Sequence, residues 1–373
     1  MTVTKKERLL SLDIFRGITI LLMILVNNPG SWSYVYSPLR HAEWNGCTPT
    51  DLVFPFFLFI VGVTTAFSLG RIKEQENDLK PFFIRLIRRS ATLFLLGLIL
   101  SGFPKYELST IRIPGVLQRI AVVYLFTGII FLTVKKENIV YLFAFLVLLY
   151  WGLMTLIPVP GVGYANLEPA TNLGAWLDFS LFGNHLWSGS KVWDPEGLLS
   201  TIPAIGTALL GVMTGYWLKS NNEKTTKTVW MFFYGVVLMA LGYVWDFWFP
   251  INKSIWTSSY VVYTGGLALV FLAFCYWLID VHGKQWWIKP FHIYGMNAIT
   301  VFFLSGIFGR LLYLIKVENS LGNTITLKSY IYQEIFLPYF SPINASLMYA
   351  ISFILLWLFL MWLLYRKNIF IKV

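Results

Sequence analysis

Residues 11–60 read SLDIFRGITILLMILVNNPGSWSYVYSPLRHAEWNGCTPTDLVFPFFLFI and decide the fold. An apolar run ends at Asn27, a polar loop carries His41, and a second apolar run begins after Asp51. Crossing the hydrocarbon core takes about 20 residues of helix, and each run approaches that length. The stretch therefore predicts two membrane-spanning helices joined by a loop that holds an imidazole where the span meets water.

Long apolar runs recur along the whole chain. Of its 373 residues, 57% are hydrophobic and 13% are charged, whereas soluble domains carry about 25% charged residues. Lipid cannot satisfy backbone N–H and C=O groups, so runs of this length fold as helices. We count about ten runs, which predicts an all-α, polytopic transmembrane helix bundle that forms a single domain over residues 1–373. The runs are 13–27, 51–70, 86–102, 115–134, 139–157, 201–218, 228–249, 259–280, 293–315 and 344–365.

Basic residues indicate the orientation, because cytoplasmic loops are enriched in them. Nineteen of the 29 lysines and arginines fall in one set of alternate segments, from Lys5, Lys6 and Arg8 near the start to Lys372 near the end, and seven fall in the opposite set. This bias predicts that both termini are cytoplasmic and that His41 faces the periplasm. The net charge of +11 is then a topology signal that implies no nucleic-acid partner, since the basic residues are spread over short loops.

One long segment, residues 158–200, lies between two predicted spans on the outer side. It is rich in Pro, Gly, Asn and Trp and contains Asp194 and Glu196 just before the next span. Its length is too small for a separate domain and too great for a simple connection. We expect it to form a lid or an acceptor-binding cap.

Cysteine and histidine usage predicts neither a disulfide framework nor a metal site. Cys47 and Cys275 fall in an outer loop and in a predicted span, so we expect them to be unpaired. The four histidines are scattered, and no pair has the spacing of metal ligands.

Three arginines remain inside the apolar runs: Arg16, Arg119 and Arg310. A charge in hydrocarbon is costly, so each should face the bundle interior toward a partner or a ligand. Arg16 falls near the cytoplasmic end, where pairing with Asp13 one helical turn away is the structural alternative. Arg119 and Arg310 fall nearer the outer end, as do His41, Asp51 and Asp246.

Several motifs together resemble the catalytic membrane domain of heparan-alpha-glucosaminide N-acetyltransferases. The motifs are Arg8–Gly17 (RLLSLDIFRG), Val26-Asn27, His41–Gly46 (HAEWNG), Asp51–Phe56 (DLVFPF), Gly115–Arg119 (GVLQR), Asp194–Gly197 (DPEG), Asn252-Lys253 with Trp256, and Gly295-Met296-Asn297. They occur in one order over nearly the whole chain. The compact form of the chain looks similar to bacterial members of the family, and Asn28-Pro29-Gly30 after Asn27 departs from the animal enzymes.

This resemblance implies transfer of an acetyl group from cytoplasmic acetyl-CoA to an amino sugar or related glycan on the outer face. It implies a multi-pass protein of the bacterial inner membrane that needs no metal, and it suggests a homodimer. The acceptor expected for a bacterial chain is a cell-envelope or scavenged amino sugar. The lipid bilayer and the glycan are thus the expected partners.

In this reading His41 acts either as general base toward the acceptor or as a nucleophile that passes through an acetyl-imidazole. Asn27 or Asn45 would donate a hydrogen bond to the developing oxyanion, or else cap the ends of helix and loop. Asp51 would orient His41, or else cap the helix that follows it.

The resemblance also implies which residues contact the acetyl donor and which contact the acceptor. Donor contacts are expected from Arg16, Gln118, Arg119 and Asn297, while the arginines at 85, 88 and 89 either meet the coenzyme A phosphates or mark the cytoplasmic side. Acceptor contacts are expected from Trp44, Asp194, Glu196, Asp246 and Arg310.

Transport is the competing hypothesis. An aromatic-rich bundle with a polar centre could carry an amino sugar across the inner membrane without acyl transfer. The reaction needs a proton-accepting group at position 41, whereas a transporter would tolerate glutamine there.

Overall fold

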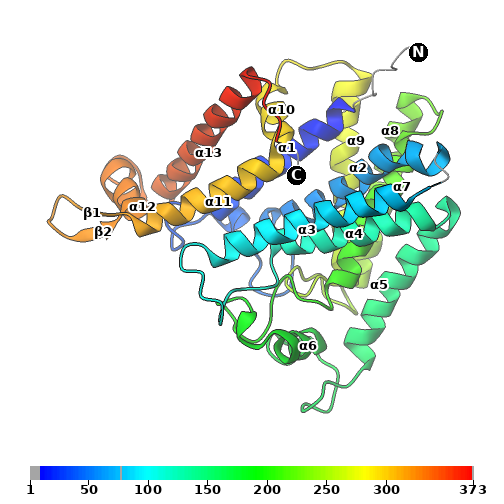
Figure 1. The fold of residues 1–373 in the computed structure, drawn as a ribbon, viewed down its shortest axis with the longest axis horizontal. Coiled ribbons are helices and arrows are strands. Elements are labelled where there is room, and N and C mark those ends of the chain that lie inside the picture. Colours follow the sequence, from blue (N-terminus) through cyan, green and yellow to red (C-terminus); the bar gives the residue numbers. More distant parts are fainter. Residues whose placement is uncertain (1–8, 76–77, 372–373) are drawn as a thin grey trace.

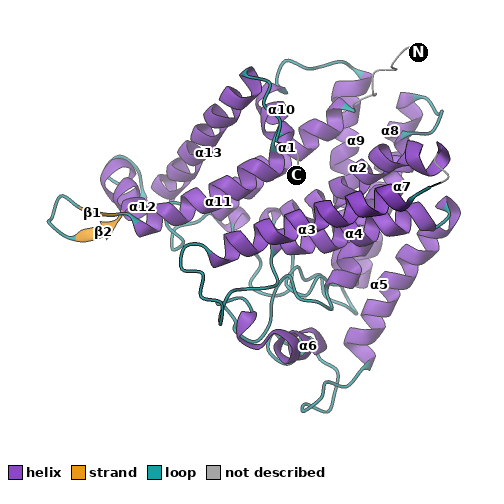
Figure 2. Ribbon diagram, in the orientation of Figure 1, coloured by secondary structure: helices purple, strands orange, loops and turns teal. Residues whose placement is uncertain are grey.

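The computed structural model describes residues 9–75 and 78–371. About 68% of the chain is helical, and the prediction of an all-α polytopic fold is confirmed (Figure 2). The basic residues Lys5, Lys6, Arg8 and Lys372, on which the orientation partly depends, lie outside the described residues.

Thirteen α-helices and one small hairpin make up the described chain (Figure 1). The helices are α1 Leu10–Asn27, α2 Val53–Gln75, α3 Lys80–Gly102, α4 Val116–Thr133, α5 Ile139–Leu156, α6 Leu173–Phe182, α7 Thr201–Leu218, α8 Lys224–Trp245, α9 Ser258–Tyr276, α10 Lys289–Met296, α11 Ala298–Leu314, α12 Leu327–Tyr330 and α13 Pro342–Arg366. Strands β1 Lys316–Glu318 and β2 Thr324–Thr326 pair antiparallel, with Val317 opposite Ile325.

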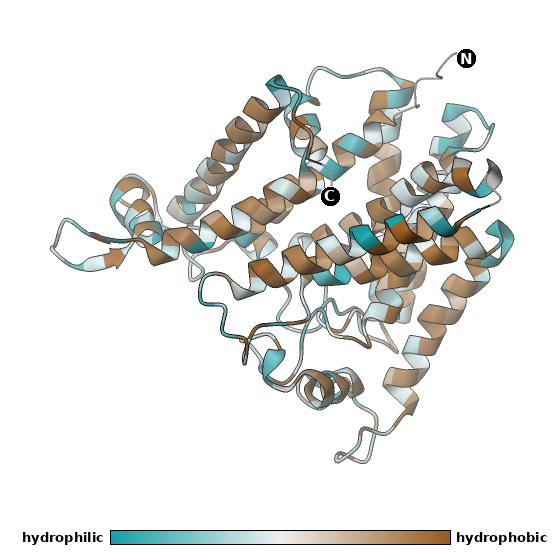
Figure 3. Cartoon of the chain, viewed as in Figure 1, coloured by the Kyte–Doolittle hydropathy of each residue, from teal (hydrophilic) through white to brown (hydrophobic). Residues whose placement is uncertain are grey.

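Eight helices of the described chain are long and apolar enough to cross a membrane, and α10 with α11 would make a ninth. The sequence suggested about ten, and the difference lies in two places. The expected span 86–102 is α3, whose first turns carry Arg85, Arg88 and Arg89 and are visibly more polar than the rest of the helix (Figure 3). The expected span 293–315 is broken into α10 and α11, which meet at 82°.

Asn297 occupies the break between α10 and α11. Its Nδ2 donates to Ile369 O at 3.2 Å, and its Oδ1 accepts from Ile371 N at 2.9 Å. Helix α10 also touches α1 backbone to backbone, since a Cβ on Gly17 would meet Phe291 O and one on Gly295 would meet Asp13 O. Small residues allow such close contact between membrane helices.

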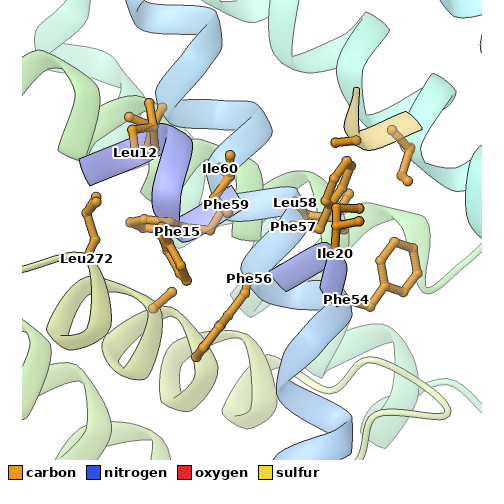
Figure 4. Close-up of a cluster of buried hydrophobic side chains, with 14 of the residues drawn as sticks. Leu12, Phe15, Ile20, Phe54, Phe56, Phe57, Leu58, Phe59, Ile60 and Leu272 are labelled. Atoms are coloured by element: carbon orange, nitrogen blue, oxygen red, sulfur yellow. The ribbon is translucent and has the colours of Figure 1, made fainter. Parts of the chain in front are cut away.

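Helix α2 forms the centre of the bundle. Its apolar side chains are buried on all sides, which is typical of a core helix rather than a surface helix. Phe15 of α1 packs edge-on against Phe56 at 5.4 Å, in the cluster drawn in Figure 4. The residues directly before α2 are thereby held at a fixed place at one end of the bundle.

The loops at that end are hydrogen-bonded to one another. Gly30 N donates to Ser346 O, Gly46 N to Ile251 O, Trp44 Nε1 to Leu167 O, and Ile113 N to His185 O. These bonds join the α1–α2, α3–α4, α5–α7 and α8–α9 connections and the start of α13. Helix α6 lies at this end, away from the first turns of α1 in Figure 1.

The crossing of α2 and α7 generates a stability prediction. A Cβ on Gly211 would lie 2.0 Å from Phe59 O, so the two backbones approach too closely for any side chain there. Gly211→Ala should lower the midpoint of thermal unfolding by several degrees, because overpacking a helix contact costs about 1–3 kcal/mol. The measurement is unfolding of the purified protein in detergent.

Gly152→Ala is the matched control for Gly211→Ala. A Cβ at Gly152 of α5 meets only Leu156 Cδ1, at 3.9 Å. Alanine favours a helix over glycine by about 1 kcal/mol, so this variant should be as stable as the native chain or more so. Equal midpoints for the two variants would contradict the close contact of α2 and α7.

Candidate active site

His41 and Asp51 form a hydrogen-bonded pair at the end of the bundle where the loops meet. His41 Nδ1 lies 2.6 Å from Asp51 Oδ1. The Asp51 side chain is 1% exposed and the His41 side chain is 48% exposed. Since a carboxylate only accepts hydrogen bonds, the imidazole carries its proton on Nδ1 and leaves the Nε2 lone pair for an outside partner.

The second oxygen of Asp51 organises the loop before it. Asp51 Oδ2 accepts from Ala42 N and from Thr48 N, each at 3.0 Å. Thr48 and Asp51 form a capping box on the short 3-10 helix Pro49–Leu52 that leads into α2. The two roles left open by the sequence, orienting His41 and capping a helix, are therefore filled by one carboxylate.

Helix α9 also contacts the residue that orients His41. Tyr260 Oη donates to Asp51 O at 2.5 Å, and the tyrosine is fully buried. Trp256 packs edge-on against Tyr260, with a ring separation of 5.3 Å, and donates from Nε1 to Thr207 of α7. Trp256 has a positive φ of 52°, a conformation rare outside glycine.

The loop after His41 is fixed to the turn between α8 and α9. Asn45 Oδ1 accepts from Asn252 Nδ2 at 3.1 Å, and Gly46 N donates to Ile251 O at 2.7 Å. Gly46 has φ +108°, which glycine adopts readily. Asp246 closes the same turn by accepting from Ile251 N.

An ion-pair network joins the α3–α4 connection to the α5–α7 connection. Arg112 contacts both oxygens of Asp194, at 2.8 and 2.5 Å, and also Glu196. Burial raises the pKa of Glu196, but Arg112, Lys253 and Arg119 outweigh it, so the pKa lies below its ordinary value. Of the three acidic residues predicted to bind acceptor, Asp194 and Glu196 are therefore already paired within the protein.

Two further buried charges adjoin this network. Arg119 donates to Gly197 O at 2.7 Å and to Ser200 Oγ, and its guanidinium lies 5.2 Å from the Trp256 ring. Asp178 of α6 accepts from Leu198 N at 2.8 Å. Burial raises the pKa of Asp178 to about 6.

Tryptophans cluster beside the ion pairs. Trp193 packs edge-on against Trp44 at 5.1 Å and against Trp187 at 5.6 Å. Trp44 donates from Nε1 to Leu167 O, which fixes its ring three residues after His41. Tryptophan faces are suitable surfaces for stacking a pyranose ring.

A cavity of about 250 Å³ opens between α1, α3, α11 and α13. Asn27 and Arg310, both predicted site residues, line it. Helix α1 also contacts the 3-10 helix that carries Asp51. The cavity and the His41–Asp51 pair thus share one end of α1.

The remaining predicted residues have structural contacts. Arg16 lies 3.3 Å from Asp13 Oδ1, as the pairing alternative expected. Gln118 is buried between α3 and α4, where its Nε2 donates to Ser101 Oγ. Asn297 binds the segment 369–371, as described above.

Sequence reasoning missed five residues of this site. Asn252 and Trp256 belonged to recognised motifs but received no role, and Thr48 and Tyr260 carried no signal at all. Arg112 was treated as an ordinary loop charge, because nothing in the sequence links it to Asp194, 82 residues away.

Neither cysteine is in a disulfide, as predicted. Burial and the neighbouring Asp51 raise the pKa of Cys47 to about 12, so its thiol stays protonated. Over residues 9–75 and 78–371, no three His, Cys, Asp or Glu side chains are grouped to hold a metal ion.

Comparison with known proteins agrees with the motifs. A family model described as heparan-alpha-glucosaminide N-acetyltransferase, catalytic, matches residues 8–244. The heparan-alpha-glucosaminide N-acetyltransferase of Homo sapiens is 30% identical over 98% of this chain, and that of Mus musculus is 29% identical over 79%. The chain spans 60% and 53% of the length of these relatives.

Asp178 generates a pH prediction. A carboxyl whose pKa is raised by folding stabilises the protein fully below its unfolded pKa, and this contribution is lost as the pH rises through about 6. Asp178→Asn keeps an acceptor for Leu198 N–H but does not titrate. The loss of unfolding free energy between about pH 5 and about pH 7.5 should therefore be smaller in the variant, by about 1 kcal/mol.

Thermal unfolding at a series of pH values checks this, with the native chain and Asp178→Asn measured side by side. Glu196 contributes the opposite trend in acid, but equally in both proteins, so the difference isolates Asp178. Parallel pH profiles would show that this carboxyl is not protonated near neutral pH.

Proposed function

The chain belongs to the heparan-alpha-glucosaminide N-acetyltransferase family, and we propose that it transfers an acetyl group from acetyl-CoA to an amino sugar or related glycan at His41. The observation that carries the proposal is the pair of His41 and Asp51. A buried carboxylate fixes the tautomer of a half-exposed imidazole, which is the arrangement a general base requires.

In the proposed reaction the acceptor nitrogen attacks the thioester carbonyl carbon as His41 Nε2 takes its proton. The carbon–sulfur bond then breaks, and the coenzyme A thiolate receives the proton. The alternative route passes through an acetyl-imidazole and uses the same lone pair. Asp51 supports both routes, because it stabilises the positive imidazolium.

Asn45 is the proposed donor to the developing oxyanion. Its Oδ1 already accepts from Asn252, so its Nδ2 is the part of the amide left to donate. Asn27 is a second donor, and it lines the cavity at the end of α1. Amide side chains commonly fill this role.

The acceptor is proposed to approach between the α5–α7 connection, which contains α6, and the loop that carries His41. Trp44 and Trp187 offer aromatic surface there, and Trp187 is 38% exposed. Since Asp194 and Glu196 are buried and held by Arg112, we propose that they serve the acceptor indirectly, by rigidifying this surface. Arg16 remains the proposed contact for donor phosphates at the opposite end of α1.

Acetyl transfer predicts a clear result with labelled acetyl-CoA and glucosamine. Purified native protein should form labelled product, and His41→Ala should lose at least about 10²-fold in rate, as expected for removal of a general base. Asp51→Asn should also be slow, since an amide does not favour the Nδ1–H tautomer. Product formation is followed by chromatography.

Lys316→Met is the matched control, because Lys316 is exposed on β1 and outside the proposed site. Label that stays on the native protein without acceptor, and is absent from His41→Ala, would identify the acetyl-imidazole route. Unchanged turnover in His41→Ala would refute the proposal. Uptake of glucosamine without any acetylation would favour transport instead.

We further infer that the His41 loop faces the outside of a bacterial inner membrane while both termini are cytoplasmic, from the distribution of lysine and arginine. Single cysteines test this in a background of Cys47→Ser and Cys275→Ala. An impermeant maleimide should label Glu43→Cys in intact cells and Asn222→Cys only after permeabilisation; both positions are exposed. The reverse pattern would invert the orientation.

A further inference from the structure

Helix α6 directs its charged side chain toward the protein and its large apolar side chains outward. It reads LGAWLDFSLF over Leu173–Phe182, with one charged residue, Asp178. Asp178 is 3% exposed, whereas Trp176, Phe179 and Leu181 are 39%, 54% and 58% exposed. A helix at a water-covered surface shows the reverse pattern, with its apolar stripe inward and its charged residues outward. The outward side of α6 is therefore suited to an apolar environment.

Contacts on the inward side hold α6 in this orientation. Asp178 Oδ1 accepts from Leu198 N at 2.8 Å. A Cβ on Gly197 would lie 1.9 Å from Asp178 Oδ2, so the helix is docked closely on the segment before α7. The outward direction of the apolar side chains is thus determined by contacts on the opposite side of the helix.

The outward side of α6 continues the surfaces of two membrane spans. Helix α6 contacts α5, and Leu173 packs against a buried cluster that joins Met154 of α5 to Phe249 after α8. Only 28% of the α5 span and 22% of the α8 span is buried within the protein, so most of both helices faces lipid. The apolar side of α6 therefore adjoins a surface that the bilayer covers.

Exposed aromatic side chains surround the outer ends of these spans. Phe247 and Trp248 directly follow α8, and Tyr164 lies in the α5–α7 connection; all three are exposed. Tryptophan and tyrosine are enriched at the level where a membrane meets water. Together with Trp176, these side chains indicate that α6 lies at that level.

The length and direction of α6 fit a position along the membrane surface. Its ten residues span about 15 Å, far short of the about 30 Å of hydrocarbon in a bilayer. In Figure 1 α6 is seen close to end-on, whereas α5 is seen from the side, and α6 is mostly brown in Figure 3. A short apolar helix that lies across the direction of the spans is suited to the interfacial plane.

We propose that α6 is an interfacial helix whose outward side, formed by Trp176, Phe179 and Leu181, is seated in the lipid leaflet at the outer ends of α5 and α8. The α5–α7 connection is then anchored to the membrane at α6. Through the contacts of Asp178, the bilayer also sets the position of the Asp194–Gly197 segment. This inference concerns a lipid surface as partner and is independent of acetyl transfer.

Fluorescence quenching of the full chain in lipid vesicles tests the proposal. Phe179→Cys and Glu43→Cys are made in the background of Cys47→Ser and Cys275→Ala and labelled with an environment-sensitive fluorophore. Nitroxide-labelled lipids quench a probe in the bilayer, and iodide on both sides of the membrane quenches a probe in water. Lipid nitroxides should quench the Phe179→Cys probe at least about twofold more than the Glu43→Cys probe, because an interfacial helix buries its apolar face about 5–10 Å into the headgroup and acyl boundary.

The depth of the nitroxide gives a second readout. A nitroxide near the headgroup should quench the Phe179→Cys probe more than one near the end of the acyl chain. Leu148→Cys is the matched control, since Leu148 is exposed at the middle of α5, and its probe should show the opposite order. Glu43 is exposed in the loop that carries His41, so iodide should quench the Glu43→Cys probe most. If Phe179→Cys does not fold, Leu181→Cys carries the test.

Two results would overturn the proposal. One is quenching of the Phe179→Cys probe by iodide as strongly as the Glu43→Cys probe, with no effect of lipid nitroxides, which would place the outward side of α6 in water. The other is protection of the Phe179→Cys probe from both quenchers, which would place a protein surface over α6. Disulfide crosslinking of Phe179→Cys between two chains would then identify that surface as a second copy.

Discussion

Burial of the Asp51 carboxylate is the constraint on which this corner of the molecule depends. It stands at the head of α2, an apolar helix enclosed by the bundle, where an unpaired charge would cost several kcal/mol. The chain meets that demand by folding the preceding loop around it. Ala42, Thr48 and His41 all supply donors, so the placement of the imidazole follows from the solvation of the acid.

Close contacts between helices provide the rigidity that this arrangement needs. Gly211 brings α7 against α2, and Gly17 and Gly295 bring α10 against α1. Because hydrophobic association between helices is weak in lipid, tight packing and buried hydrogen bonds supply most of the stabilisation of helix contacts. The helices thus form a rigid support, to which Tyr260 attaches the backbone of Asp51 and Asn252 attaches the loop that carries His41.

Much of this fold could be predicted from the sequence, because an apolar run of membrane-spanning length has few alternatives to a helix. His41, Asn45 and Asp51 were singled out as candidates because they stand in recognisable motifs between the first two spans, and the structure shows that hydrogen bonds hold all three. The break at Asn297 was not, because the runs on either side of it are continuous in hydropathy. Nor could the partners of Arg112 or the burial of Lys328 be predicted, since both depend on which loops meet in space.

The bonds between Asn297 and the segment 369–371 have a mechanical consequence. They tie the junction of α10 and α11 to a segment that lies more than 70 residues downstream in the sequence. A change in the angle between α10 and α11 would have to break these hydrogen bonds. A displacement of residues 369–371 would in turn act on the junction of the two helices. The angle between α10 and α11 is thus coupled to the position of residues 369–371.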